Sequence, residues 1–393
     1  MKTMKIIIGS ESFAPNISGV ATATELLATN LAKAGNEVWV FVPSESYKTY
    51  EDKAFRDFIV VRFNSLPNPF RKGFRFATFS QQEIFRFIRE IEPDIIHLQD
   101  PVGISSQLLK AARRYHIPIV VSNHFSLDYI TSYFRYLKLI HPQIKFFFRA
   151  LLRRFYNRCD YVICPTETVR SDLKNWGVKT PIVAISNGVD LDRFFDYFDL
   201  TEFNDKYHLP PNKKVLYAGR IDRDKNVEVL IRAIPEVIRS MNIHFVIAGD
   251  GSELVRLKKL VQKLNIEHAV SFVGWIDQSA DDYLQVFQSA DVFVMTSKIE
   301  TQSIVTMEAM AAGLPVIGAN GGALPELIKN NCNGCLFNPG DSGDLAKKIT
   351  KVLTDSKLRK KMKAESLRLI ASHEIKKSFI KINEIYDKVI KKN

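Results

Sequence analysis

Short runs of β-branched and aliphatic residues alternate with longer amphipathic segments, and this alternation restricts the possible folds more than any other feature. In the first half, the predicted strands and helices cover residues 5–9, 19–34, 37–42, 94–98, 105–115 and 117–122. The pattern restarts after Lys213 and covers residues 215–218, 227–240, 244–248, 252–264, 271–273, 281–289, 292–296, 303–312 and 315–318. Such alternation is typical of parallel βαβ units. It therefore predicts an α/β protein with two Rossmann-like, doubly wound domains.

The length of 393 residues leaves room for two or three domains, and the content of 46% hydrophobic and 25% charged residues is that of an ordinary globular protein. The polar segment 190–212 lies between the two alternating regions. We expect it to be the linker, with one domain over residues 1–190 and a second over 191–375.

Basic residues outnumber acidic ones by 55 to 43, which gives a formal net charge of +12. This balance favours anionic partners and does not by itself separate nucleotides, nucleic acid and acidic lipid headgroups. No apolar run approaches the roughly 20 residues that span a bilayer, so membrane contact is expected to be peripheral. The short apolar run at residues 5–9 is followed at once by polar residues, and we interpret it as a buried strand rather than a secretion signal.

Four cysteines in so long a chain are typical of a reducing compartment. Cys332 and Cys335 have C-x-x-C spacing, which fits a redox pair or half of a zinc site. The alternative is a turn formed by the intervening Asn-Gly, with both thiols packed as small apolar groups.

Two acidic residues, Glu300 and Glu308, are separated by seven residues and follow a predicted strand at 292–296. If a helix begins near Ser303, Glu300 lies in the loop at the carboxyl end of the strand and Glu308 lies about a turn and a half into the helix. Both then face the crevice where open α/β sheets bind ligands, and the helix N-terminus offers N–H groups to a diphosphate. Spacing alone leaves ordinary surface glutamates as an equal alternative.

The block at residues 300–317 resembles the signature of the retaining glycosyltransferases of the GT-B fold, a family 4-like group that includes sucrose synthases and phosphatidylinositol mannosyltransferases. Further motifs of that family occur in the expected order at residues 13–21, 186–190, 217–226, 248–251 and 272–275. The resemblance covers nearly the whole chain. It implies two Rossmann-like domains facing a central cleft, with the acceptor on the first and the nucleotide-sugar on the second. It also implies that a helix over about 376–393 packs back on the first domain.

Arg220 and Lys225 follow a strand and the flexible Gly219. A departing nucleoside diphosphate accumulates negative charge, which a forked guanidinium and an ammonium stabilise well in a closed site. The alternative is a solvated charge cluster. The resemblance assigns the sugar hydroxyls to Glu300 and the ribose hydroxyls to Glu308. The remaining donor-binding positions are backbone and loop residues, namely Gly19, Val20, Ser303 and Ile304.

His124 follows a predicted strand and resembles the family histidine that contacts the donor sugar near the reacting carbon. A structural role is the alternative. For His97, lining of the cleft and packing remain equally open. The catalytic set expected from the resemblance is His124, Glu300, Arg220 and Lys225, with retention of anomeric configuration through front-face attack and no covalent nucleophile.

No D-x-D motif stands after a strand of the first domain, so we expect metal independence, with no cofactor besides the nucleotide-sugar substrate. Residues 301–303 read Thr-Gln-Ser where many family members have x-Phe-Gly. Thr-Gln looks like the members that glycosylate diacylglycerol, whereas Ser303 in place of glycine departs from the pattern.

Residues 129–158 contain seven Lys or Arg, nine aromatics and no Asp or Glu, and residues 70–76 have the same character. Such a stretch fits an anionic membrane surface, or an anionic glycan or lipid-linked sugar diphosphate. The expected contact residues are Arg71, Lys72, Arg75, Lys145, Arg149 and Arg153. The alternative for the helix itself is that Phe146, Phe147, Leu151 and Phe155 form its buried face.

Together these features predict a hexosyltransferase that moves glucose from UDP-glucose to a lipid such as diacylglycerol, in the cytoplasm at the inner face of the cell membrane. Transfer to a soluble sugar, polysaccharide or lipid-linked glycan is the enzymatic alternative. A non-catalytic basic binding module is the alternative of another class. We find no nucleic-acid-binding motif and expect no nucleic-acid partner.

Overall fold

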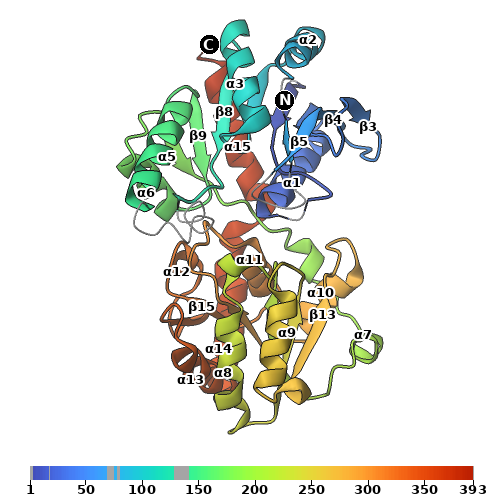
Figure 1. Cartoon of the computed structure of the whole chain (residues 1–393), viewed down its shortest axis with the longest axis vertical. Helices are drawn as coiled ribbons and strands as arrows, with labels where there is room; N and C mark the ends of the chain where they lie inside the picture. The colour runs from blue at the N-terminus through green and yellow to red at the C-terminus, as the bar shows by residue number, and fades with distance from the viewer. Residues whose placement is uncertain (1–2, 17, 69–74, 78–79, 128–140, 393) are drawn as a thin grey trace. The chain divides into compact units, whose positions relative to one another are not determined.

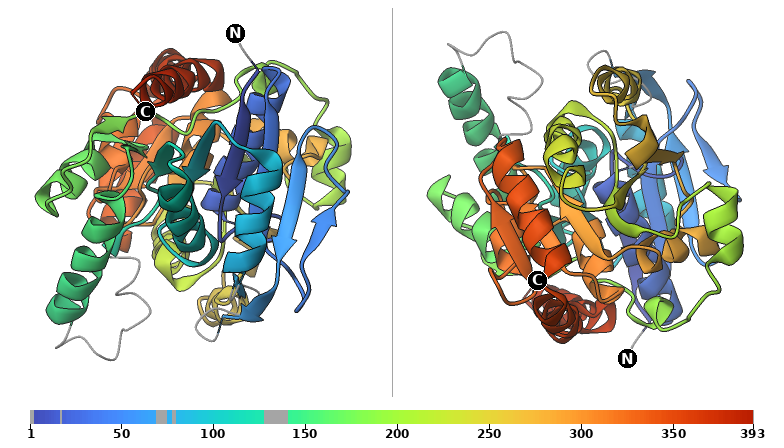
Figure 2. Two further views of the ribbon diagram at one scale, coloured as in Figure 1. Left: turned by 90° about the horizontal axis from the view of Figure 1, so that it is seen from above. Right: turned by 90° about the horizontal axis from the view of Figure 1, so that it is seen from below.

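The alternating segments build two parallel β-sheets, one in each of two structural units, which confirms the predicted α/β class (Figures 1 and 2). The computed structural model describes residues 3–16, 18–68, 75–77, 80–127 and 141–392. Unit 1 comprises Met1–Asn187 and Lys376–Asn393, and unit 2 comprises Gly188–Ile375. Each unit carries its own sheet with helices packed against it.

The sheet of unit 1 has eight strands in the order β10-β9-β8-β7-β1-β2-β4-β3. The strands of unit 1 are β1 (Lys5–Gly9), β2 (Glu37–Pro43), β3 (Tyr50–Asp52), β4 (Ile59–Phe63), β7 (Ile95–Leu98), β8 (Ile119–Ser122), β9 (Tyr161–Cys164) and β10 (Ile182–Ala184), with β5 (Ser65–Pro67) and β6 (Arg75–Ala77) forming a separate pair. Its helices are α1 (Gly19–Lys33), α2 (Gln81–Ile91), α3 (Gly103–Tyr115), α5 (His141–Tyr156), α6 (Glu167–Asn175) and α15 (Ile375–Ile390). Within the main sheet only β3 runs antiparallel, at the edge.

Strand β1 lies at the centre of this sheet, between β2 and β7. Ile6, Ile7 and Ile8 have no exposed surface, as expected for a parallel strand with both faces covered. Helix α15 supplies Tyr386 and Val389 to the apolar cluster on one of these faces. The last helix therefore completes the core that the first strand begins.

The sheet of unit 2 has six parallel strands in the order β13-β12-β11-β14-β15-β16. The strands are β11 (Lys213–Ala218), β12 (Ile243–Ala248), β13 (Val270–Gly274), β14 (Val292–Met295), β15 (Val316–Ala319) and β16 (Gly334–Phe337). The helices are α7 (Thr201–Lys206), α8 (Glu228–Ile238), α9 (Leu254–Lys263), α10 (Asp281–Gln288), α11 (Ile304–Ala311), α12 (Leu324–Leu327), α13 (Ser342–Thr354) and α14 (Ser356–Ile370), and 3₁₀ turns cover Asp192–Phe194, Arg223–Lys225, Glu267–Ala269 and Ala371–His373.

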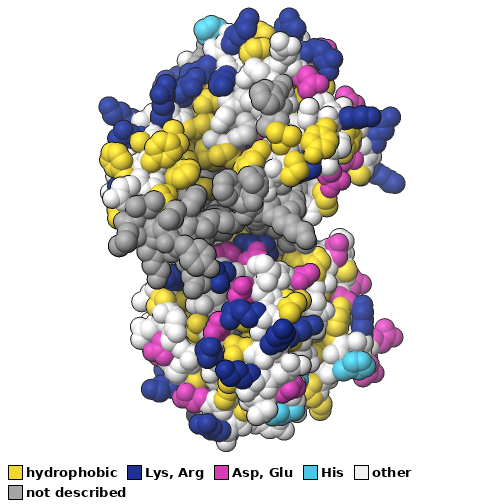
Figure 3. Space-filling model, in the orientation of Figure 1, with side chains coloured by type: hydrophobic (Ala, Val, Ile, Leu, Met, Phe, Trp, Pro, Cys, Tyr) yellow, Lys and Arg dark blue, Asp and Glu magenta, His cyan; other side chains and the backbone are white. Residues whose placement is uncertain are grey.

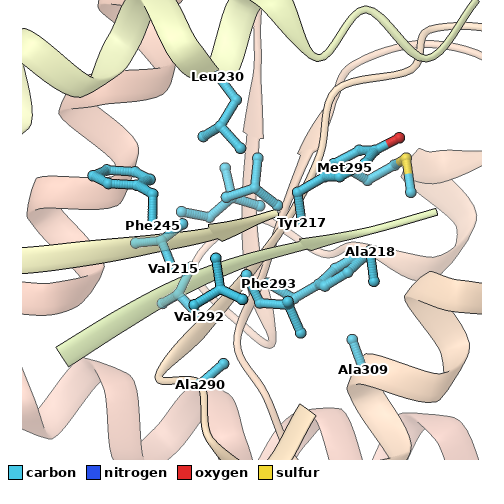
Figure 4. Close-up of a cluster of buried hydrophobic side chains, with 14 of the residues drawn as sticks. Val215, Tyr217, Ala218, Leu230, Phe245, Ala290, Val292, Phe293, Met295 and Ala309 are labelled. Atoms are coloured by element: carbon cyan, nitrogen blue, oxygen red, sulfur yellow. The ribbon is translucent and has the colours of Figure 1, made fainter. Parts of the chain in front are cut away.

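The core of unit 2 is formed by the central strands. Figure 4 shows Val215 and Tyr217 of β11 beside Phe245 of β12 and Phe293 of β14, all of them buried. The chain passes from β11 to β12 and β13 on one side and then returns to place β14 on the other. The strand order therefore reverses between β11 and β14, and ligands of open α/β sheets bind beside such a reversal.

Residues 190–212, which we expected to form a linker, belong to unit 2. Phe203 and Leu209 are buried in the core of unit 2, and the Phe194 and Phe287 ring centroids lie 6.1 Å apart. Although the segment is mostly polar, apolar residues lie between the polar ones, and these apolar side chains reach the core of unit 2. The chain changes units at Gly188 and again after Ile375.

The two places where the chain changes units lie side by side. Val189 pairs with Glu374, its N–H donates to His373 O at 2.9 Å, and Ile375 N–H donates to Val189 O at 3.0 Å. Gly188 has a φ of +82°, and a Cβ there would lie 2.7 Å from the Ile375 Cα. This close approach explains the glycine of the 186–190 motif.

Candidate functional site

Three of the predicted donor-binding side chains lie near the strand-order reversal of unit 2. Gly219 follows β11 with a φ of +135°, and its carbonyl oxygen lies so close to Gly249 that a Cβ at that position would be 1.9 Å away. Arg220 and Lys225 follow this turn, whereas Glu300 lies in the loop between β14 and α11. The two loops with glycine at positions 219 and 249 therefore interlock and hold the basic residues at this edge.

Lys225 and Glu300 form a direct ion pair, in which Lys225 Nζ donates to Glu300 Oε1 at 2.5 Å. Burial alone would raise the pKa of Glu300, but the positive charge of Lys225 and its hydrogen bond outweigh burial and lower the pKa. Glu300 is also fixed through its backbone, because its carbonyl oxygen accepts from Ala323 N–H at 2.9 Å. Its carboxylate is thus charged and oriented.

Arg220 contacts two carboxylates on its own loop. Its guanidinium donates to Asp222 and, at 3.0 Å, to Asp224 Oδ2. Asp222 also accepts from the N–H and hydroxyl of Ser252, at 3.0 and 2.9 Å, which ties this loop to the 248–251 motif. The cations that sequence analysis assigned to a diphosphate are therefore paired with carboxylates in this structure.

Glu308 lies in α11 and accepts a hydrogen bond of 2.7 Å from the hydroxyl of Tyr283 in α10. Burial raises the pKa of Glu308 to about 7, and the bond from Tyr283 and the charge of Arg193 act in the opposite direction. Tyr283 was not found from the sequence, because a tyrosine in an amphipathic helix has the same pattern as an ordinary core residue.

Helix α11 begins at Ile304, as predicted, and Ser303 precedes it with a φ of +79°. The Ser303 carbonyl accepts from the N–H groups of Thr306 and Met307, both at 3.2 Å. Positive φ is the region that favours glycine. The departure from the family pattern therefore has a cost, because Ser303 adopts with strain a backbone conformation that glycine takes without strain.

In unit 1, Gly19 and Val20 form the first turn of α1. Ser18 caps this helix by accepting from Ala21 N–H at 3.1 Å. Among the described residues, a Cβ at Gly19 would meet nothing within 4 Å, so packing against them does not require the glycine. Open space at a helix N-terminus is compatible with the approach of an anion to the backbone.

His124 and His97 have different environments. His97 has no exposed surface, and its ring nitrogens lie 2.6 Å from the Tyr386 hydroxyl and 2.8 Å from the Ser122 hydroxyl. It therefore packs inside unit 1. His124 lies just beyond β8 with Nε2 at 2.9 Å from Gln99 Oε1. Burial lowers the pKa of His124 to about 4, so its ring is neutral near pH 7.

Buried Glu11 and partly buried Asp100 form an acidic pair that was not found from the sequence. The Glu11 carboxylate accepts from Ala77 N–H at 2.8 Å and from Ile104 N–H at 2.7 Å, and the Glu11 N–H donates to Asp100 Oδ2 at 2.5 Å. Burial raises the pKa of both carboxyls. The pair fastens the loop after β1 to the start of α3 and to β6.

The basic aromatic stretch is only partly covered by the structure. Arg71, Lys72 and residues 129–140 lie outside the described residues. Arg75 does not extend freely, because its guanidinium donates to the hydroxyl and carbonyl of Ser65 at 2.7 and 2.8 Å. Lys145, Arg149 and Arg153 lie on α5.

The alternative that Phe146, Phe147 and Leu151 are buried is wrong. They are 72%, 59% and 47% exposed. The buried face of α5 carries Phe155 together with Leu152 and Tyr156. Figure 3 shows hydrophobic side chains at the surface in the region of α5, with Lys and Arg beside them. Helix α5 therefore presents an apolar and basic outer face.

The structure shows no bond between Cys332 and Cys335. Both thiols are free, with Cys335 buried in β16 and the Cys332 thiol 3.3 Å from Glu365 Oε2. Within the described ranges there is no group of three or more His, Cys, Asp or Glu placed to hold a metal ion. In the same residues no helix combines the length and apolar character needed to cross a bilayer.

Both units match models of known protein families. Residues 201–368 match the family model "Glycosyl transferases group 1", and residues 17–193 match "Glycosyltransferase Family 4". The chain is 29% identical over 340 residues to the alpha-monoglucosyldiacylglycerol synthase of Streptococcus pneumoniae, covering 85% of this chain and 75% of that protein.

Among solved structures, the sucrose-phosphate synthase of Thermosynechococcus elongatus has a TM-score of 0.81 at 20% identity over 99% of both chains. The Anabaena protein HepE in complex with UDP-glucose has a TM-score of 0.78 at 19% identity, covering 98% of this chain and all of that one. At such identities the likeness establishes the fold.

Proposed function

Because the chain belongs to the group 1 and family 4 glycosyltransferases and has their two-domain GT-B fold, we propose that it transfers glucose from UDP-glucose to a membrane lipid such as diacylglycerol. Unit 2 binds the nucleotide-sugar and unit 1 binds the acceptor. The name of the pneumococcal relative supports the sugar and the lipid class, and the UDP-glucose complex of HepE supports the nucleotide.

The observation that carries the donor assignment is the cluster of Arg220, Lys225 and Glu300 at the strand-order reversal. On donor binding, the diphosphate oxygens take the place of carboxylates around the two cations. Lys225 then stabilises the departing diphosphate, and Glu300 accepts a hydrogen bond from a sugar hydroxyl. Glu308, held by Tyr283, accepts from the ribose hydroxyls.

In the reaction, the bond between the anomeric carbon and the UDP oxygen breaks as the acceptor oxygen bonds to the same face of that carbon. The acceptor proton passes to the departing phosphate oxygen, so the products are the glucosylated lipid and UDP with configuration retained. Because Arg220 and Lys225 supply two positive charges for the diphosphate, we propose that neither a metal ion nor a further cofactor is needed.

The outer face of α5 supports a lipid acceptor. Phe146 and Phe147 are exposed, and Arg149, Arg153 and Arg154 are exposed on the same helix. Aromatic rings insert at the headgroup level and each basic residue near an anionic surface contributes about 1 kcal/mol. We propose that this face docks on the inner leaflet of the cell membrane and brings unit 1 to its substrate.

The donor assignment is tested by a transfer screen with UDP-, GDP- and ADP-sugars and diacylglycerol in anionic vesicles, with EDTA present. We expect glucolipid from UDP-glucose alone, and at least a hundredfold slower transfer by Glu300→Gln and Lys225→Ala. Lys263→Ala, an exposed change on α9, is the matched control. Wild-type rates in the two site variants would refute the site.

Docking is tested by co-sedimentation of Phe146→Ser/Phe147→Ser with vesicles that contain or lack anionic lipid. We expect weaker binding than for the wild type, whereas Phe195→Ser, which removes a 70% exposed phenylalanine of unit 2, should bind normally. Equal binding by all three proteins would refute the role of α5.

The transfer screen also separates the alternative functions. Hydrolysis of UDP-glucose without lipid product would favour a soluble glycan acceptor. If the protein neither turned over nor bound a nucleotide-sugar, a non-catalytic module would be favoured.

A further inference from the structure

Gln99 and His124 meet at the carboxyl ends of the adjacent strands β7 and β8. Gln99 Oε1 lies 2.9 Å from His124 Nε2. Backbone hydrogen bonds tie both segments to neighbouring strands, because Gln99 N–H donates to Gly9 O at 2.8 Å and Asn123 N–H, next to His124, donates to Ile163 O at 2.8 Å. Asn123 Oδ1 also accepts from Phe125 N–H at 2.6 Å, which fixes the turn that carries His124.

An amide oxygen can only accept a hydrogen bond. In the Gln99 orientation of this structure, His124 must therefore carry its proton on Nε2, and Nδ1 of the neutral ring is left as an acceptor. If Gln99 only packed in the core, we would expect both its amide oxygen and its amide nitrogen to have hydrogen-bond partners. Within the described part of the chain, however, the buried Gln99 Nε2 and Asn123 Nδ2 have no hydrogen-bond partner.

We propose that Gln99 is a positioning residue that holds the His124 imidazole in its Nε2–H form and so presents Nδ1 as a hydrogen-bond acceptor to a substrate hydroxyl. The inference rests on the proposed function and on the role that the family resemblance implies for His124, contact with the transferred sugar. The unpaired amide donors of Gln99 and Asn123 add two groups able to bind substrate oxygens at the same strand ends.

The electrostatic surroundings favour a neutral ring at position 124. Burial lowers the pKa of His124, and His97 is the titratable group whose charge interacts with it. Burial also holds His97 neutral, so His97 brings no charge to the pair. Asp100 adjoins Gln99 in sequence but bonds to the backbone of Glu11 and Val102. The hydrogen bond that His124 Nε2–H donates to Gln99 Oε1 is thus the specific restraint on the His124 ring.

The tautomer can be read directly by long-range ¹H–¹⁵N spectra of histidine-labelled protein without substrate. We expect the Nε2–H form in the wild type and a mixture of both neutral forms in Gln99→Leu. In Gln99→Glu a carboxylate replaces the amide, so the pKa of His124 should rise by about 1–3 units. The acidic inflection in the pH profile of kcat/KM for glucosyl transfer should move to higher pH with it.

Gln82→Glu, which places the same charge on an exposed position of α2, should leave the tautomer and the pH profile unchanged. An Nδ1–H ring in the wild type, or the same tautomer and His124 titration in wild type and Gln99→Leu, would overturn the proposal. Because the spectra need no substrate, they test the positioning role even if the acceptor or donor differs from the one proposed.

Discussion

At the proposed donor site, the side chains assigned to donor binding in unit 2 are already bound to partners that a substrate would replace or share. Lys225 is paired with Glu300, Arg220 with Asp222 and Asp224, and Glu308 with Tyr283. The sequence indicates Arg220 and Lys225 through their charge and their position after Gly219. It gives no sign of Tyr283, because its role depends on two helices meeting in space.

The pair of Glu308 and Tyr283 predicts a pH dependence of donor binding. The pKa of Glu308 is raised from 4.5 to about 7, so the folded protein keeps a proton between these values that the unfolded chain loses. Stability should therefore fall as pH rises through this window, whereas affinity for UDP-glucose should rise through pH 7 as the carboxylate forms.

Tyr283→Phe removes a hydrogen bond to the charged form of Glu308 and should move the inflection in affinity to higher pH. Titration calorimetry of UDP-glucose against pH measures this shift. Tyr207→Phe, which removes an analogous bond to Asp282, is the control and should leave the inflection in place. A pH-independent affinity in the wild type would contradict the assignment of ribose binding to Glu308.

Ser303 predicts a stabilising substitution. Its φ of +79° is costly for any residue with a Cβ, so Ser303→Gly should raise the free energy of unfolding by about 1 kcal/mol. Ser303→Ala keeps the Cβ and loses the hydroxyl that lies 2.7 Å from the Thr306 hydroxyl, so it separates strain from hydrogen bonding. The free energies of unfolding are measured with urea. A higher value for Ser303→Ala than for Ser303→Gly would show that backbone strain is not decisive.

At the scale of helices and strands, the alternation of the sequence predicts most central strands but not which face of α5 is buried. Both faces of that helix carry aromatic residues, so its periodicity fits two orientations. The structure buries the face with Leu152 and Phe155 and exposes Phe146 and Phe147. Strands β9 and β10 were not predicted, although strands of similar length such as β7 and β14 were.

Helix α15 gives a prediction at this scale. Tyr386 buries its ring and bonds to His97 in β7, so Tyr386→Phe leaves a buried ring nitrogen without its partner. We expect a loss of about 1–3 kcal/mol in the free energy of unfolding. Tyr197→Phe, at a residue that is 97% exposed, is the matched control and should change stability little. Equal denaturant midpoints would show that the bond is dispensable.

At the scale of the whole molecule, each unit has an apolar core of its own: among the described residues, one cluster lies in unit 2 and two lie in unit 1. The sequence predicts two domains because the strand–helix pattern restarts. It misplaces the connection, because the segment after residue 190 has polar residues around side chains that pack into unit 2.

Separate cores predict two calorimetric transitions, since each core can be lost without disrupting the other. UDP-glucose should raise mainly the midpoint of the unit 2 transition, because the charged side chains proposed to bind the donor lie in unit 2. Lys225→Ala should abolish that shift and keep both transitions. A single transition that moves as a whole with UDP-glucose would contradict independent unfolding of the units.

The return of α15 to unit 1 has a consequence for synthesis on the ribosome. Tyr386 and Val389 complete the cluster that contains Ile6 and Ile8, so strand β1 waits for a helix that is translated only after all of unit 2. Unit 2, contiguous from Gly188 to Ile375, can finish folding earlier. Nascent unit 1 therefore carries a partly uncovered apolar sheet face while unit 2 is translated, and this is the interval in which chaperones have the most to protect.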